Sequence, residues 1–350
     1  MVDNLSRPGF KVDGAGARGA DDDELFRVLF SNEILTNFDT ACIMKQFGVH
    51  RRIRGGKSAM FPVLGRAKAE WHAAGDDMIS DVTADGNPYL STIPGSEVEV
   101  HVDDPIVSPV LIPRIDELKN AFDLRAPYAR ELGQALAHKA DRNLMAVLYD
   151  AADASAAIIG GSQGTDALAP IDFGGVSGTP GAYTPANLEA FAFDCAAEMD
   201  TQGLPTEGRR LLVRPKMYWA LVESGSKAIQ KEYSEGNGDY AKGVIHTLAG
   251  MPIVTCPEFG KLTTDLTAAT TGINDTGSRN GDYGRDWTGV GALAFHNSAY
   301  GVLTMEDVAL ETSWIPWRRS TFTVASYVMG QKMLRPDAAI AGLVADLSGT

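Results

Sequence analysis

The sequence predicts an α+β fold, in which helical and strand-rich sections follow one another along the chain. Apolar residues at spacings of three and four indicate two helical sections, one near residues 25–38 and a longer one over roughly 114–153. Apolar and polar residues alternate at Val98, Val100 and Val102 and along several runs after residue 290, which indicates strands. The regular strand–helix–strand alternation of a nucleotide-binding fold is not found in this order of elements.

Composition limits the classes of protein that this chain can belong to. It has 350 residues, 44% of them hydrophobic, which suits one large domain or two linked domains. A formal net charge of −14 argues against tight nonspecific binding to a polyanion such as DNA. Cys42, Cys195 and Cys256 are odd in number and widely spaced, so we expect buried thiols in a reducing compartment. We expect neither a signal peptide nor a membrane helix.

The N-terminal section predicts a flexible arm followed by a helix. Residues 1–20 are rich in Gly, Ala and Arg and show no periodicity, and an acidic run at 21–24 follows them. Acidic side chains suit the positive end of a helix, which this run would begin. The apolar face of the predicted helix consists of Leu25, Phe26, Leu29 and Phe30.

Residues 51–105 predict an extended β-hairpin that has little core of its own. Glycines and prolines interrupt its middle part, and an isolated two-stranded hairpin is only marginally stable in water. We therefore expect another part of the chain, or a neighbouring copy, to cover it. Basic residues are expected at the root of the hairpin and acidic residues further out, which suggests complementary contacts between copies. The candidate contact residues are Arg51, Arg52, Arg54, Lys57, Arg66, Lys68, Glu70, Asp76 and Asp77.

The longest helical pattern is expected to break at its beginning and then continue as a spine. Pro127 should break or kink it near residues 124–126, because proline lacks the amide hydrogen and clashes with the preceding turn. A helix of ~28 residues beyond that point would span ~42 Å. Its apolar residues are Tyr128, Leu132, Leu136, Leu144 and Leu148.

The remaining elements are expected from shorter patterns. Two segments rich in Gly and small polar residues, 155–185 and 260–288, predict long surface loops. The other predicted elements are helices over 185–202 and 215–223, and strands over 210–213, within 243–255, and over 292–295, 301–305, 308–312 and 320–328.

Two short motifs resemble phosphate-binding loops, but neither has the required context. Gly55-Gly56-Lys57-Ser58 ends like a Walker A loop, yet Arg51 occupies the position that needs glycine. Pro62 also prevents the helix that should begin at the lysine. The run Gly14–Gly19 matches GxGxxG, but no strand precedes it. We therefore interpret residues 55–58 as a turn that enters a strand.

Catalytic and metal motifs are equally weak. Ser162 lies in a GxSxG match without the preceding strand and following helix of a nucleophile elbow, so a hydrolase is only a remote alternative. His138 and Asp141 are one helical turn apart and could share a metal, but a solvated helix face is the favoured interpretation. The sequence predicts no catalytic residues, no metal and no cofactor.

Three blocks of the sequence, in the same order, resemble the major capsid proteins of short-tailed, T-seven-type tailed phages. "GKSAMFPVLGRAKAEWHAAG" (56–75) strongly resembles their extended loop, and "FDLRAPYARELGQALAHKADRNL" (122–144) looks like their spine helix. "VALETSWIPWRRSTFTVASYVMGQKMLRPDAA" (308–339) resembles their C-terminal region. Residues 14–38 are similar to their N-terminal arm and helix, whereas the resemblance is weak between about 155 and 290.

This resemblance implies the Hong Kong 97 capsid fold. It maps onto the chain as an N-terminal arm and helix over 1–50, an extended β-hairpin loop over 51–105, a peripheral domain with the spine helix over 106–185, an axial domain over 186–299, and C-terminal strands of the peripheral domain over 300–350.

The resemblance also implies a function, which is to form the shell of a phage head. Copies of the chain would assemble in the host bacterial cytoplasm as hexamers and pentamers of an icosahedral head that encloses double-stranded DNA. A scaffolding protein would guide assembly, a portal ring would occupy one vertex, and the head would expand on maturation. We expect no membrane partner. The alternative is an encapsulin-type compartment, which is a related shell without a portal or DNA.

Overall fold

The computed structural model describes most of the chain from residue 42 onward. The N-arm residues Leu25, Phe26, Leu29 and Phe30, as well as Ser162 and Asp76, lie outside the described residues. The described residues are 42–72, 74, 75, 77–79, 89, 93–115, 125–156, 158, 159, 167–174, 178–224, 238, 239, 243–264, 266 and 278–347.

A four-stranded sheet with the strand order β1-β12-β13-β4 forms one part of the molecule. Its long strands β12 (Tyr300–Ile315) and β13 (Ser320–Met333) are antiparallel, β4 (Ile106–Pro113) pairs with β13, and β1 (Val49–Arg52) runs parallel to β12. Two strands were predicted in the region of β12, but the structure has one. The register of β12 shifts between Thr304 and Ala309, which interrupts the period-two pattern of a continuous strand.

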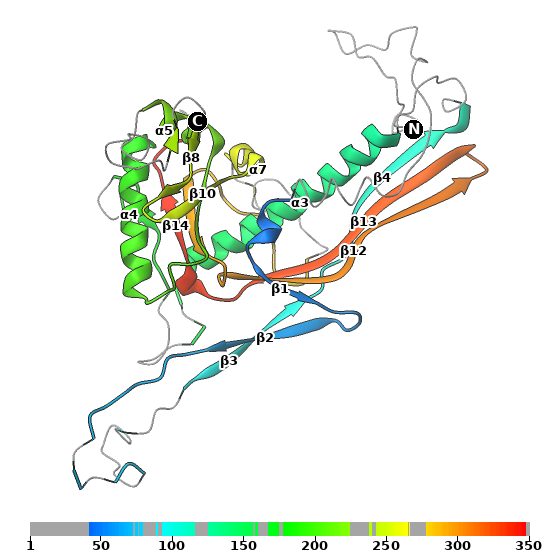
Figure 1. Ribbon diagram of the computed structural model, residues 1–350. Helices are drawn as coiled ribbons and strands as arrows, with labels where there is room; N and C mark the ends of the chain where they lie inside the picture. The colour runs from blue at the N-terminus through cyan, green and yellow to red at the C-terminus, as the bar shows by residue number, and fades with distance from the viewer. Residues whose placement is uncertain are drawn as a thin grey trace.

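A six-stranded sheet with the order β5-β14-β11-β6-β10-β9 forms the other part of the molecule (Figure 1). Three helices begin with proline directly after an extended residue, where the missing amide hydrogen of proline is not needed. The strands are β5 (Ile171–Asp172), β14 (Ala339–Leu343), β11 (Val290–His296), β6 (Arg209–Val213), β10 (Met251–Thr255) and β9 (Thr247–Leu248); the helices are α4 (Pro185–Thr201), α5 (Pro215–Glu223) and α7 (Pro257–Lys261).

The sheets do not follow the expected boundaries at residues 185 and 300. β14 pairs with β11, and β5 pairs with β14, so two strands from the ranges assigned to a peripheral domain lie in the same sheet as β6 and β10. The expected surface loops are corrected as well, because Leu168, Phe173, Tyr283 and Trp287 are buried in the core. Short pieces complete the chain: η1 (Met44–Gln46), η2 (Pro336–Ala338), and β7 (Gly238–Asp239), which pairs with β8 (Val244–Ile245).

The spine helix α3 (Arg125–Asp153) packs against both sheets. Pro127 lies in its first turn, where proline is tolerated, so the helix begins close to the predicted break. Leu132, Leu136, Leu144 and Leu148 are buried as predicted, while Tyr128 is partly exposed. Burial raises the pKa of Tyr128 to about 12.

A buried arginine holds together the sheet and the helices beside it. Arg214 precedes α5, and its guanidinium donates hydrogen bonds to the carbonyl oxygens of Val290 (2.8 Å), Phe259 (3.0 Å) and Leu262 (2.6 Å). The Val290 carbonyl lies at the start of β11, the Phe259 carbonyl lies in α7, and the Leu262 carbonyl directly follows α7. Burial lowers the pKa of Arg214 to about 10. Among the described residues, no helix is both long and apolar enough to cross a membrane.

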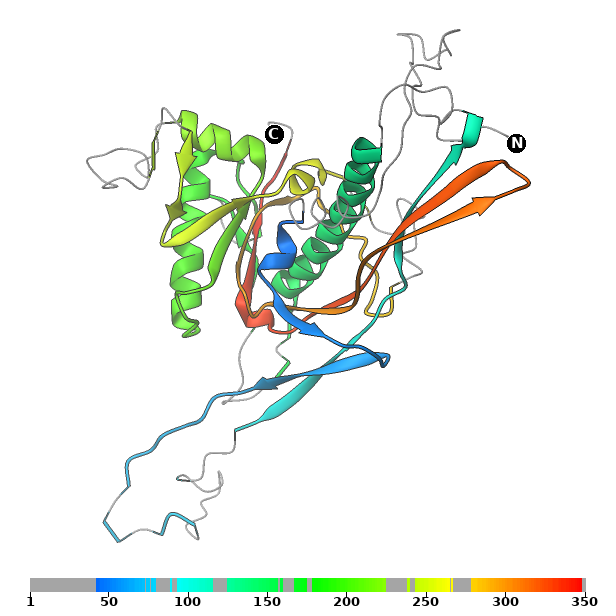
Figure 2. The same cartoon turned by 45° about the vertical axis from the view of Figure 1, so that its right-hand side comes forward.

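A two-stranded hairpin of β2 (Ser58–Leu64) and β3 (Gly95–His101) projects from the body (Figures 1 and 2). Its inner half has a small core, in which Phe61, Val63 and Val100 pack with Leu303 and Leu334 of the body. The body of the same chain therefore covers the paired strands, which is one of the two ways of covering the hairpin that the sequence predicts. Figure 2 shows the chain continuing outward beyond β2, away from both sheets.

Candidate functional site

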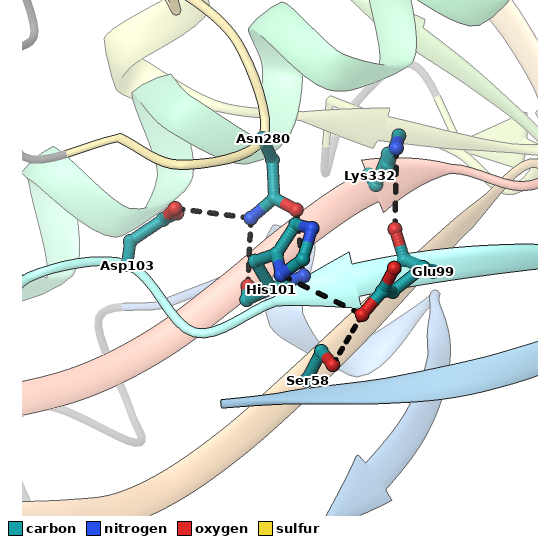
Figure 3. A network of polar contacts seen from close by, with 6 residues as sticks. All are labelled: Ser58, Glu99, His101, Asp103, Asn280 and Lys332. Atoms are coloured by element: carbon teal, nitrogen blue, oxygen red, sulfur yellow. Dashed lines mark hydrogen bonds and ion pairs between the residues drawn. The ribbon is translucent and has the colours of Figure 1, made fainter. Parts of the chain in front are cut away.

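The hairpin root is the point where the projecting hairpin is fixed to the body. We define it as Ser58, Glu99, His101, Asp103, Asn280 and Lys332, which Figure 3 shows together. Asn280 lies in the segment before β11, and its side chain makes two hydrogen bonds with the backbone of β3. Its Oδ1 accepts from the His101 amide at 2.8 Å, and its Nδ2 donates to the His101 carbonyl oxygen at 2.7 Å. This side chain thus continues the backbone pairing of β3, as a neighbouring strand would.

Asp103 connects the same segment to the end of the hairpin. Its carboxylate accepts hydrogen bonds from the Tyr283 hydroxyl (2.5 Å), the Arg279 amide (2.7 Å) and Asn280 Nδ2 (3.0 Å). Burial raises the pKa of Asp103, whereas these hydrogen bonds act in the opposite direction. Next to it, Asp104 forms an ion pair with Arg279 at 3.0 Å. Residues 278–283 therefore act as a strap across the hairpin root.

The opposite side of β3 rests on the body strand β13. Lys332 Nζ donates to the Glu99 carbonyl oxygen at 3.2 Å, and Ser58 Oγ donates to Glu99 Oε1 at 2.5 Å. A Cβ atom at Gly330 would approach the His101 carbonyl oxygen closer than 3.0 Å. The backbone of β3 therefore lies directly on that glycine, and no larger residue fits there.

The predicted contact residues do not form a single cluster. Arg51 and Arg52 belong to β1 at the edge of the four-stranded sheet, where Arg52 forms an ion pair with Asp307 at 2.7 Å. Arg51 donates to the Met60 carbonyl oxygen and stacks over Phe61, with 5.6 Å between its Cζ atom and the ring centroid. Arg54 and Lys57 lie in the exposed turn that leads into β2.

The outer contact residues lie beyond the paired strands, so the prediction that all the basic residues gather at the root is wrong. The pairing of β2 with β3 ends at Leu64 and Gly95, and Arg66 and Lys68 follow that point. Arg66 donates a hydrogen bond to the Gln202 carbonyl oxygen at the end of α4. Glu70 and Asp77 are exposed further along the segment.

Asp141 is not on a solvated helix face, contrary to the prediction. Its side chain is 1% exposed, and its oxygens accept hydrogen bonds from the amides of Ile43 (3.2 Å) and Met44 (3.0 Å) and from the Cys42 thiol (3.1 Å). It therefore fastens residues 42–44 to the spine helix. Burial raises the pKa of Asp141. His138 faces Glu258 instead, at 3.4 Å.

Metal binding and thiol reactivity are the two kinds of chemistry that concern these groups. Within the part of the chain that the structure describes, no group of three or more His, Cys, Asp or Glu residues could hold a metal ion. All three cysteine side chains are buried and unbridged, as predicted. Burial raises the pKa of Cys256 to about 11, so this thiol is protonated near neutral pH.

A cavity of about 420 Å³ lies beside the hairpin root, between α3, β4 and β13. Ile106 and Val107 of β4, Leu136 of α3 and Met329 of β13 give it an apolar lining. Tyr283 and Gln331 also line it, so it borders the strap. Sequence reasoning missed the strap, since Asn280 and Tyr283 lie in a segment with no periodicity. It also missed Arg214, which directly follows the apolar run 211–213 and belongs to no motif.

Sequence comparison identifies close relatives. A family model described as "Gp10A-like: Major capsid protein" matches residues 60–343. The major capsid protein of Enterobacteria phage T3 is 29% identical over 340 residues, which cover 93% of this chain and 93% of that protein. The major capsid protein of Escherichia phage T7 is 28% identical over 339 residues, covering 90% of each.

Solved structures agree with the sequence relatives. The capsid structure of the Cyanophage P-SCSP1u has a TM-score of 0.69 and 28% identity, and covers 87% of this chain and 89% of that chain. The mature capsid of bacteriophage PhiM1 has a TM-score of 0.65 over 98% of each chain, at 13% identity, and so shares the fold. These phage capsids have the Hong Kong 97-type fold, and they favour a phage capsid over an encapsulin-type compartment. The chain belongs to the Gp10A-like family of phage major capsid proteins.

Proposed function

We propose that copies of this major capsid protein assemble as hexamers and pentamers into an icosahedral head that encloses double-stranded DNA. The observation that carries this proposal is the projecting hairpin, whose outer part exposes large apolar side chains. Leu64 and Trp71 are 67% and 97% exposed. Exposed apolar groups of this size at the end of a rigid projection indicate a surface that another protein covers.

The rigid hairpin root supports a lapping role for the hairpin. A projection that crosses onto a neighbouring copy transmits orientation only if its base is fixed, and the strap and Gly330 fix this one. In this proposal the contact surface includes Arg54, Lys57, Lys68, Glu70 and Asp77, and charges of both signs along it set the register between copies. In this proposal the chain has three structural units, which follow the sheets. They are the projecting hairpin, the four-stranded sheet with α3, and the six-stranded sheet with its helices.

Further partners belong to the same proposal. A scaffolding protein guides assembly in the host bacterial cytoplasm, a portal ring occupies one vertex, and the head expands on maturation. The protein has no enzymatic role in this proposal. The relatives named above are capsid proteins, which supports self-assembly as the central activity.

The proposal is tested by removing the outer hairpin while keeping its paired strands. The full chain and a variant with residues 72–93 replaced by a short Gly-Ser linker are each expressed with the scaffold gene and examined by negative-stain electron microscopy. We expect closed shells from the full chain and a soluble, folded subunit without shells from the variant. Normal shells from the variant would contradict the lapping role, and discrete monomers from both proteins would contradict the capsid assembly proposal.

A further inference from the structure

We infer that Trp71 of each copy inserts into the cavity beside the hairpin root of a neighbouring copy. This inference rests on the proposed function, since it identifies the contact through which one copy holds the next. Two observations on separate parts of the molecule lead to it. One is a fully solvated tryptophan on the projection, and the other is an apolar cavity at the surface of the body.

Trp71 is the most exposed large apolar side chain in the described part of the chain, at 97%. An indole side chain buries about 150–250 Å² when it enters a protein site. Tryptophan is also among the residues most often found to dominate the binding energy of an interface. Two of the five residues before Trp71, Ala67 and Ala69, are alanines, so the surrounding segment is slender enough to approach a concave surface.

The cavity in the same copy is out of reach of Trp71. Ser58 pairs with His101 at the root and Leu64 with Gly95 at the outer end, so six residue steps separate the two ends of the paired region. At about 3.4 Å per residue this is ~20 Å, and Trp71 lies seven residues further along the chain. Figures 1 and 2 both show the segment after β2 leading away from α3 and β4. Trp71 can therefore enter this cavity only in a second copy.

The lining of the cavity fits an indole. Its volume of about 420 Å³ lies within the range of ~300–1,000 Å³ of protein sites that bury organic groups. The Tyr283 ring and the Met329 thioether are favourable neighbours for an aromatic ring. Gln331 lines the cavity, and its amide nitrogen and oxygen have no hydrogen-bond partner among the described residues. Rotation of that side chain would offer its oxygen to the indole N–H.

The contact also has the symmetry that a ring of subunits needs. Each copy provides one tryptophan and one cavity, and these lie on different parts of its surface. Such a head-to-tail contact closes into rings when its rotation fits and otherwise continues as an open filament. Asp103 and Tyr283 line the cavity, so an inserted indole ring would also contact the strap that fixes the neighbour's own hairpin.

A disulfide test distinguishes this contact from other contacts between copies. Val107 lies on β4, lines the cavity and is 54% exposed. The double variant Trp71→Cys with Val107→Cys is expressed with scaffold, its particles are oxidised, and the chains are separated on a denaturing gel without reductant. Because a disulfide needs a Cα separation below ~7 Å, a link within one chain is excluded, and we expect a ladder of linked chains. The matched control pairs Trp71→Cys with Trp317→Cys, a site that is 85% exposed at the tip of the β12–β13 hairpin, and should give no ladder.

Shells of the double variant without a ladder, or a ladder in the Trp317 control alone, would overturn the inference while the capsid proposal stands. If the double variant forms no shells, Val107→Cys alone, which keeps Trp71, is labelled with a bimane fluorophore that tryptophan quenches on contact. We expect quenching in shells but not in free subunits, and loss of the quenching when Trp71→Phe is added. Equal fluorescence with and without Trp71 would refute the insertion. Absence of shells from the unmodified chain would instead refute the proposed function.

Discussion

The Asn280 side chain satisfies both backbone groups of His101, and its removal should loosen the hairpin root. Asn280→Ala leaves the His101 amide and carbonyl without these partners, at a cost of about 1–3 kcal/mol. We expect hydrogen exchange at the His101 amide to become at least tenfold faster, which corresponds to about 1.4 kcal/mol. Ser58→Ala is the control, since it removes a side-chain contact of Glu99 and none of His101. Equal exchange in both variants would show that Asn280 does not fix the root.

Gly330 should not tolerate even the smallest side chain. A methyl group there collides with the His101 carbonyl oxygen, which belongs to the backbone and cannot rotate away. We expect Gly330→Ala to lower the melting temperature of the subunit by several degrees and to reduce shell yield, because β3 must lift from β13. Gly55→Ala is the matched control, because a Cβ at Gly55 meets nothing within 4 Å. A Gly330→Ala protein as stable as the Gly55→Ala protein would contradict this packing.

Asp141 should give the subunit a measurable pH dependence. Burial raises its pKa in the folded state above the ordinary value of 3.8, so the folded protein binds the proton more tightly than the unfolded chain does. This contribution to stability is therefore largest below 3.8 and declines as pH rises through the folded-state pKa. We expect Asp141→Asn to destabilise the fold by about 1–3 kcal/mol, with the smaller difference at the higher pH. Urea unfolding of both proteins from pH 4 to pH 7 measures this, and a difference that grows with pH would contradict it.

These residues explain why the candidate site could not be predicted from the sequence. The partners of Asn280 and Asp141 lie far away along the chain, near residues 101 and 43, and no local pattern connects such positions. The sequence predicted a solvated face for Asp141 because no second pair of metal ligands accompanies His138 and Asp141. Asp141 is buried because residues 42–44 cover it, and its carboxylate accepts hydrogen bonds from the amides of Ile43 and Met44.

At the scale of elements, α3 derives its stability from the apolar face that the sequence predicted. Leu144 is fully buried on that face, so Leu144→Ala should leave a cavity and destabilise the subunit by about 2–5 kcal/mol. Glu131→Ala on the exposed face of the same helix is the control and should change stability by less than about 0.5 kcal/mol. Chemical denaturation of the subunit gives both values. Equal effects would show that α3 is not packed as described.

The helices α3, α4 and α5 were predicted because their signals are local, whereas the short helix α7 was missed. Pro127, Pro185 and Pro215 mark helix beginnings, and the apolar spacing behind each one continues for several turns. The sequence did not predict β4 and β14, although they have 8 and 5 residues. Pro109 and Pro113 made β4 an unlikely strand, but it lies at the edge of its sheet, where proline is tolerated. β14 is a continuous apolar run at a sheet interior, without the alternation that identifies a half-buried strand.

At the scale of the whole molecule, the net charge of −14 should weaken the binding of a shell subunit to DNA. Duplex DNA carries a charge about every 1.7 Å of its axis, so tight binding requires many lysine and arginine contacts. With 45 acidic against 31 basic residues, a subunit repels DNA at long range, and a packaged genome would stay free to move along the inner wall. We therefore expect no binding of purified subunits to a labelled duplex at about 0.15 M salt, where screening extends over ~8 Å. Fluorescence anisotropy measures this. Tight binding that weakens steeply with added salt would reveal a basic inner surface and would contradict the idea that the shell contains DNA by enclosure alone.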